Sequence, residues 1–120
     1  MRASARAFVS KEIAPNLDAW EEQRGFPDEL FPRCGELGFF GLSVPEEYGG
    51  TEYGNLAMIL TTEELSRASL AGAGSLITRP EILTKALLQG GTEEQKKHWL
   101  PKIASGELMV GISVTEPDVG

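Results

Sequence analysis

The stretch that decides the fold is residues 92–106, which read TEEQKKHWLPKIASG. Thr92 and Gln95 have the spacing of a capping box, in which two side chains bond the free backbone N–H groups at a helix start. Gly106 is a typical helix stop. The apolar side chains that would form the buried face are Trp99, Leu100 and Ile103. This stretch therefore predicts an amphipathic helix with defined ends.

Upstream of this helix, apolar spacing and stop signals predict four more helices. Their expected ranges are Ala3–Glu22, Pro27–Gly38, Asn55–Ser69 and Ala71–Gln89. Pro15 lies inside the first range, where proline removes a helical hydrogen bond, so we expect a kink or a frayed start there. Cys34 belongs to the apolar stripe of the second range and is expected to be a buried core residue. The predicted fold class is all-α, an antiparallel bundle of about five helices.

The last segment changes periodicity. In residues 109–115 the apolar positions alternate, which predicts a β-strand, and residues 116–120 resemble a turn. No convincing partner strand precedes this one, and a single strand leaves its backbone groups unpaired. We therefore expect an orphan strand that opens a second, β-rich domain. The predicted division is a helical domain at 1–107 and the start of a truncated β-domain at 108–120.

Composition excludes several classes of function. The 120 residues carry a formal net charge of −7 and are 41% hydrophobic, which favours a soluble globular domain and argues against nucleic acid as a partner. No apolar stretch reaches the roughly 18 residues of a membrane span, and no secretory signal is expected. A single cysteine favours a reducing, cytoplasmic location, and a lone histidine, His98, argues against a histidine-rich metal site.

Four motifs follow one another with the order and spacing of a known family. They are Val44–Gly50, Gly91–Pro101, Gly106–Glu107 and Val114–Pro117. In these motifs the chain resembles the acyl-CoA dehydrogenases over essentially its whole length, and its run Thr78–Glu81 is similar to the methylsuccinyl-CoA dehydrogenase subgroup. The resemblance implies a helical N-terminal domain followed by a β-barrel and a second helical bundle. It also implies FAD as cofactor, an acyl-CoA substrate, an electron-transfer flavoprotein as acceptor, and a homo-oligomer such as a homotetramer.

The resemblance assigns a flavin-contacting role to the predicted strand and turn. The expected cofactor-binding residues are Ile112, Val114, Thr115 and Gly120. Many relatives carry an aromatic residue at the position of Ile112, so one aromatic contact would be missing. The family's catalytic glutamate belongs to a C-terminal domain outside this chain, so no catalytic residue is expected here. Glu46 and Glu47 are interpreted instead as loop acids. Glu63 and Glu64 are interpreted as part of a solvated helix face.

The resemblance also implies that the fourth predicted helix lines the acyl pocket. The expected substrate-binding residues are Gly74, Ile77, Thr78 and Arg79. The small residues at 71–75 fit either this role or the close packing of a neighbouring helix. Arg79 could pair with the distal carboxylate of a dicarboxylic substrate, or it could point to solvent or pair near Glu81.

Two rival functions remain at this stage. One is a stand-alone helical interaction module, which would use the bundle only for contacts between proteins. The other is an acyl-CoA oxidase or flavin monooxygenase of the same architecture, which would differ in how the reduced flavin meets oxygen. Under the dehydrogenase reading, the chain is a fragment that is inactive alone.

Overall fold

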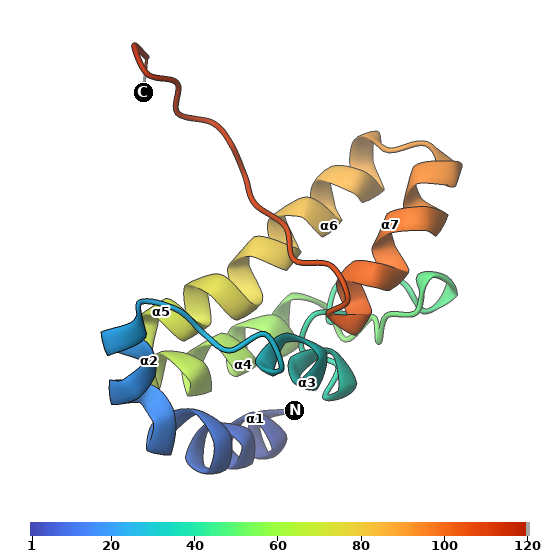
Figure 1. The fold of residues 1–120 in the computed structure, drawn as a ribbon. Coiled ribbons are helices and arrows are strands. Elements are labelled where there is room, and N and C mark those ends of the chain that lie inside the picture. Colours follow the sequence, from blue (N-terminus) through green and yellow to red (C-terminus); the bar gives the residue numbers. More distant parts are fainter. Residues whose placement is uncertain (120) are drawn as a thin grey trace.

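The computed structural model describes residues 1–119 and is built from helices (Figure 1). Its α-helices are α1 (Arg2–Phe8), α2 (Leu17–Gln23), α3 (Leu30–Glu36), α4 (Gly54–Ala68), α5 (Leu70–Ala73), α6 (Arg79–Gly90) and α7 (Glu93–Ser105). With the turns that join α1 to α2 and α5 to α6, these segments form the five predicted helices. The all-α fold class is therefore confirmed. No helix within residues 1–119 is both long and apolar enough to cross a membrane.

The first predicted helix changes geometry around Pro15. A π-helical turn, η1 (Val9–Ile13), follows α1, and a 3₁₀ turn, η2 (Ala14–Asn16), precedes α2. Proline has no backbone N–H and its ring crowds the preceding turn, which accounts for the interruption of the α-helical hydrogen bonds around Pro15. The helix ends at Arg24, whose φ of 56° lies in the left-handed region.

The fourth predicted helix is also interrupted, just before Pro80. The side chain of Ser69 caps α5 by accepting a 2.9 Å hydrogen bond from the N–H of Gly72. A π-helical turn, η4 (Gly74–Thr78), then leads into α6, which has Pro80 in its first turn. Proline is tolerated there because the first N–H groups of a helix need no partner within it. The backbone hydrogen bonding therefore changes from π-helical to α-helical where α6 begins.

The capping box that starts α7 is confirmed. The N–H of Gln95 donates to the Thr92 hydroxyl at 3.2 Å, and the N–H of Thr92 donates to the Gln95 side chain at 2.9 Å. Tyr48, in the short turn η3 (Glu46–Tyr48), donates a 2.8 Å hydrogen bond to Glu93. That bond raises the pKa of Tyr48 to about 12. The Tyr48–Glu93 hydrogen bond also joins the loop between α3 and α4 to the first turn of α7.

The predicted strand at 109–115 is not present in the structure. Within residues 1–119 this segment has no strand pairing and leaves the helices as a tail, red in Figure 1. The alternating pattern indicates a segment that is able to form a strand. A strand exists, however, only where a second strand completes its hydrogen bonds. The described residues offer no such partner.

The hydrophobic core joins α1, α3, α4 and the start of the fourth predicted helix. Its fully buried members include Ala5, Ile13, Cys34, Leu65 and Leu76. Phe8 and Phe39 meet edge to face at 5.4 Å between ring centroids. Burial raises the pKa of Cys34 to about 12, so the thiol stays neutral at physiological pH, which agrees with its predicted role as a core residue.

Helices α3 and α7 cross with their backbones in direct contact. A Cβ atom placed on Gly35 would overlap the carbonyl oxygen of Ser105. Gly106, with φ of 77°, ends α7 and lies against the carbonyl of Phe31. Glycine at position 35 is therefore required by the closeness of the crossing. The sequence pattern did not single out this residue.

Two predictions about the helix faces are wrong. Trp99, expected on the buried face of α7, is 40% exposed. Glu64 is only 4% exposed, although it was expected on a solvated face. Arg6 of α1 donates two hydrogen bonds to its carboxylate, at 2.8 Å and 3.0 Å, and the guanidinium groups of Arg2 and Arg67 lie within 3.9 Å. A buried carboxylate is tolerated when it is paired in this way. Glu64 thereby fastens α1 to α4.

The crossing of α3 and α7 predicts a strong effect of one methyl group. Gly35→Ala should lower the free energy of unfolding by about 1–3 kcal/mol, because the added Cβ has to push two backbones apart. Urea denaturation of the two proteins would measure the difference. Gly90→Ala is the matched control, since a Cβ there meets no atom within 4 Å and the residue is helical. Equal stabilities of the Gly35 and Gly90 variants would contradict this account of the crossing.

The Glu64 cluster predicts a specific dependence of stability on pH. The hydrogen bonds from Arg6 hold the pKa of Glu64 below its ordinary value of 4.5. A carboxyl whose pKa is lower in the folded state stabilises the fold above its unfolded pKa, and this contribution is lost as the pH falls through the folded value. Glu64→Gln should therefore be less stable than the native protein at pH 7, and the gap should shrink below about pH 4.5.

The control for this experiment is the neighbouring glutamate. Glu63 is exposed and pairs with Arg2 at the surface, where ion pairs contribute little. Glu63→Gln should leave the stability near that of the native protein across the same pH range. A pH-independent gap between the native protein and Glu64→Gln would show that the loss comes from packing and not from the charge.

Candidate functional site

The predicted substrate-binding residues lie on η4 and the first turn of α6. The side chains of Thr78 and Arg79 are exposed, and so is Gly74. Ile77 is only 3% exposed and belongs to the hydrophobic core. Burial removes the Ile77 side chain from the accessible surface of η4 and α6. The accessible part of the predicted set is thus Gly74, Thr78 and Arg79.

The small residues at 71–75 serve two purposes. Gly72 is buried, and a Cβ on it would meet the side chain of Ser69 at 3.2 Å, so packing explains this glycine. A Cβ on Gly74 would meet nothing within 4 Å. The close-packing alternative therefore holds for Gly72, whereas within residues 1–119 the backbone at Gly74 faces open space.

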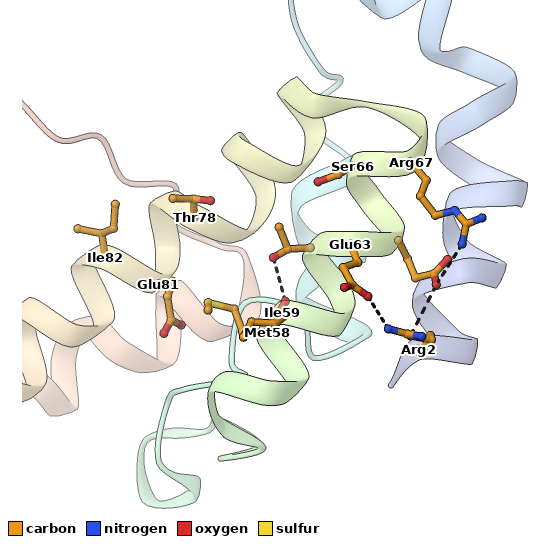
Figure 2. Close-up of a pocket in the computed structure, with 11 residues that line it drawn as sticks. Arg2, Met58, Ile59, Glu63, Ser66, Arg67, Thr78, Glu81 and Ile82 are labelled. Atoms are coloured by element: carbon orange, nitrogen blue, oxygen red, sulfur yellow. Dashed lines mark hydrogen bonds and ion pairs between the residues drawn. The ribbon is translucent and has the colours of Figure 1, made fainter.

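A first cavity, called here the α4 cavity, opens between α4 and the η4–α6 helix. Its volume is about 750 Å³. Figure 2 shows Thr78, Glu81 and Ile82 on one side of α4, and Arg2 of α1 on the other. Met58, Ile59 and Thr62 supply the wall from α4. Thr78 is the predicted substrate residue that lines this cavity.

The charged groups of the α4 cavity are already paired. Arg2 bonds Glu63, and Arg67 lies 3.9 Å from Glu64. Glu81 is 3.1 Å from Lys85 and accepts a 2.7 Å hydrogen bond from Ser43. The expected alternative in which Arg79 pairs near Glu81 is therefore not seen in the described residues. What the cavity offers a ligand is its apolar wall and the Thr78 hydroxyl.

A second cavity, called here the α2 cavity, lies where α2 and the loop after it meet α5 and η4. Its volume is about 600 Å³. Three aromatic side chains line it: Trp20, Phe26 and Phe31. Ser75 and Arg79 line it from η4 and α6, and Arg24 from the end of α2. Neither arginine makes an ion pair with another residue in 1–119.

The structure therefore separates two neighbouring residues that the sequence grouped together. Thr78 lines the α4 cavity, whereas Arg79 lines the α2 cavity. Successive residues of a helix point about 100° apart, which allows adjacent side chains to serve different cavities. Arg24, Phe26 and Ser75 were not predicted as site residues. No local pattern marks them, because the cavity forms only when α2 folds against α5.

The expected flavin-contacting residues lie in the exposed tail. Ile112 is 49% exposed and Val114 76%. The backbone groups of residues 110–115 make no hydrogen bond with other described residues, so their N–H and C=O groups are free. Together with the Thr115 hydroxyl, these donors and acceptors suit the polar edge of a flavin ring. Gly120 lies outside the described residues.

Four glutamates named in the sequence analysis, Glu46, Glu47, Glu63 and Glu64, lack the features of a catalytic base. Glu46 and Glu47 are exposed in η3, and Glu63 is exposed on α4. Glu64 is buried, but its carboxylate is taken up by Arg6 and its pKa is lowered, whereas a general base needs a value near the working pH. None of these four groups therefore combines the burial and the raised pKa that would mark a general base.

Comparison with known proteins places this geometry in context. The model of the acyl-CoA dehydrogenase N-terminal domain matches residues 1–107. The chain is 41% identical to (2S)-methylsuccinyl-CoA dehydrogenase of Cereibacter sphaeroides over 100% of its own length and 22% of that protein. It is 40% identical to glutaryl-CoA dehydrogenase of Desulfococcus multivorans, again over its full length and 32% of the relative.

A solved structure supports the same family. The crystal structure of acyl-CoA dehydrogenase from Geobacillus kaustophilus superposes with a TM-score of 0.88 at 38% identity, covering 99% of this chain and 31% of that one. The chain thus spans about a third or less of the length of these relatives. Because the domain model covers residues 1–107 and relatives match the whole chain, the chain belongs to the acyl-CoA dehydrogenase family.

Proposed function

We propose that this chain is the N-terminal part of an FAD-dependent acyl-CoA dehydrogenase and forms one wall of its acyl-binding site. The observation that carries the proposal is the exposed face of η4 and α6, where Gly74 leaves the backbone bare and Thr78 borders an apolar cavity. An acyl group needs such a surface: concave and mostly apolar, with few polar groups. The family to which the chain belongs supports the assignment.

The proposed flavin site uses the tail. FAD would supply a hydride acceptor, and Ile112, Val114 and Thr115 would hold one edge of its ring through backbone groups and the Thr115 hydroxyl, joined by Gly120. Free backbone groups at 110–115 support this role. We also propose that the tail pairs as a strand in a middle β-domain that begins near residue 108. Hydrogen bonds from backbone amides position a cofactor without adding charge.

The remaining chemistry would come from outside the chain. The α-proton of the thioester would be taken by a glutamate beyond residue 120, and an electron-transfer flavoprotein would reoxidise the flavin. We propose a cytoplasmic homo-oligomer, such as a homotetramer. With one edge of the flavin site and no base, residues 1–120 alone should bind FAD weakly and show no activity. A stoichiometric yellow complex of this chain with FAD after gel filtration would contradict that division of roles.

The substrate that we propose is a short, branched acyl-CoA with a distal carboxylate. Arg79 is exposed and has no ion pair with another described residue, so its guanidinium is available to a ligand. Arginine binds carboxylates through two parallel hydrogen bonds. Similar identities to a methylsuccinyl-CoA and a glutaryl-CoA dehydrogenase, both named for dicarboxylic thioesters, support this class without choosing between them.

The full-length enzyme provides the direct test. Mixed anaerobically with an acyl-CoA thioester, the purified flavoprotein should lose its flavin absorbance in the visible region. Rapid recovery with an electron-transfer flavoprotein, and slow recovery with oxygen, is the result expected for a dehydrogenase. Rapid recovery with oxygen would instead indicate an acyl-CoA oxidase. Absence of bleaching with every acyl-CoA tested would reject the proposed function.

Arg79→Ala tests the substrate class. In the full-length enzyme the change should raise KM for methylsuccinyl-CoA by about tenfold or more, since a charge-assisted pair contributes on the order of 1.5–3 kcal/mol. KM for a plain short-chain thioester such as butyryl-CoA should change little. Steady-state kinetics with both substrates gives the comparison. Equal effects on both, or none on either, would remove Arg79 from the site.

A further inference from the structure

We propose that the α2 cavity receives the carboxylate end of the acyl group, and that Arg24 and Ser75 determine this specificity together with Arg79. The proposal rests on the function proposed above and names the side of the helix toward which the substrate extends. The helix η4–α6 borders two cavities, so an acyl group on its exposed face could extend into either one. The charges that line the two cavities decide between them.

The α4 cavity is unsuited to an anion. Its charged lining consists of Glu63, Glu64 and Glu81 against Arg2 and Arg67, an excess of one negative charge. Both arginines are already engaged by glutamates. A further carboxylate would meet three others and would find no free guanidinium. This cavity suits an uncharged acyl chain.

The α2 cavity has the opposite balance. Its charged lining consists of Arg24 and Arg79 against a single acid, Glu21, an excess of one positive charge. No ion pair joins any two of these three residues. Two arginines that line one cavity and have no ion pair with another described residue can together bind a carboxylate.

The backbone brings the three polar groups to the cavity from two directions. Ser75 and Arg79 are four residues apart along one helix, which places them on the same face. Arg24 comes from the opposite wall, at the end of α2, where its φ of 56° turns the chain sharply. That turn is held by the N–H of Arg24, bonded to the carbonyl of Glu21 at 3.1 Å, and by the N–H of Gly25, bonded to the carbonyl of Trp20 at 3.1 Å.

Aromatic side chains complete the cavity. Trp20 and Phe26 pack edge to face at 5.7 Å between ring centroids, and Phe31 adds a third ring. Such walls would contact the branched carbon skeleton next to the carboxylate. A ligand lying against these rings would be partly shielded from water, which strengthens the hydrogen bonds of a bound carboxylate. The cavity thus combines an apolar lining with two free positive charges, as a short dicarboxylic acyl group requires.

The test uses the full-length flavoprotein and a matched pair of substrates, 2-methylsuccinyl-CoA and 2-methylbutyryl-CoA. These thioesters share a branched carbon skeleton and differ in a terminal carboxylate or methyl group. Arg24→Gln should raise KM for 2-methylsuccinyl-CoA about tenfold or more while changing KM for 2-methylbutyryl-CoA less than about twofold. Ser75→Ala should produce the same selectivity with a smaller change, since it removes one neutral hydrogen bond.

Two further variants make the result decisive. Arg24→Lys keeps the charge and should recover part of the affinity for the dicarboxylic substrate, which a merely structural role of Arg24 would not produce. Arg33→Gln is the matched control, because Arg33 is an exposed arginine paired with Glu12 and Glu36 on a different surface, and it should leave the ratio of the two KM values unchanged.

The possible failures are distinguishable. If Arg24→Gln raises both KM values equally, or neither, the α2 cavity is not the carboxylate subsite, although the dehydrogenase function stands. If the native enzyme prefers 2-methylbutyryl-CoA, the dicarboxylic substrate class is wrong and the subsite is rejected with it. If no acyl-CoA bleaches the flavin, the proposed function falls, and this inference falls with it.

Discussion

The arrangement of the helices depends on how the carboxylate of Glu64 is neutralised. A charge removed from water has to be paired, and Arg6 supplies that pair through two hydrogen bonds from the first helix. The bond holds α1 against α4, and α4 in turn packs against α5. The α4 cavity, which Glu64 itself lines, and the exposed face of η4 and α6 beside it are therefore positioned in part by this contact between α1 and α4.

Local signals predicted the parts of the fold that local physics determines. The capping box at Thr92 and the interruption at Pro15 depend on residues within one turn, and both were readable from the sequence. The burial of Glu64 was not, because its partner lies 58 residues away and isolated glutamates are usually solvated. The strand predicted at 109–115 is absent from the described residues for a related reason: alternation shows that a segment can pair, but pairing needs a second strand.

The candidate site shows the same limit. Exposure of Thr78 and Arg79 follows from the helical pattern, whereas their assignment to different cavities follows from packing. The α2 cavity exists because the end of α2 folds back beside α5, about fifty residues later in the chain. The two arginines that line it, Arg24 and Arg79, belong to no recognisable sequence motif. Their lack of an ion pair becomes visible only when the ion pairs of the described residues are known, which requires coordinates.

The π-turn η4 has a consequence for how such a site can diverge. A π-turn holds one residue more than an α-turn, and it lies directly before Pro80. The extra residue is absorbed within the turn itself, so losing it would restore a regular helix while α5 and α6 kept nearly their present orientation. The residues of the turn that border each cavity would change, but the packing of the helices on either side would not. Length variation in this single turn is therefore a route by which relatives could acquire different acyl preferences without disturbing the rest of the bundle.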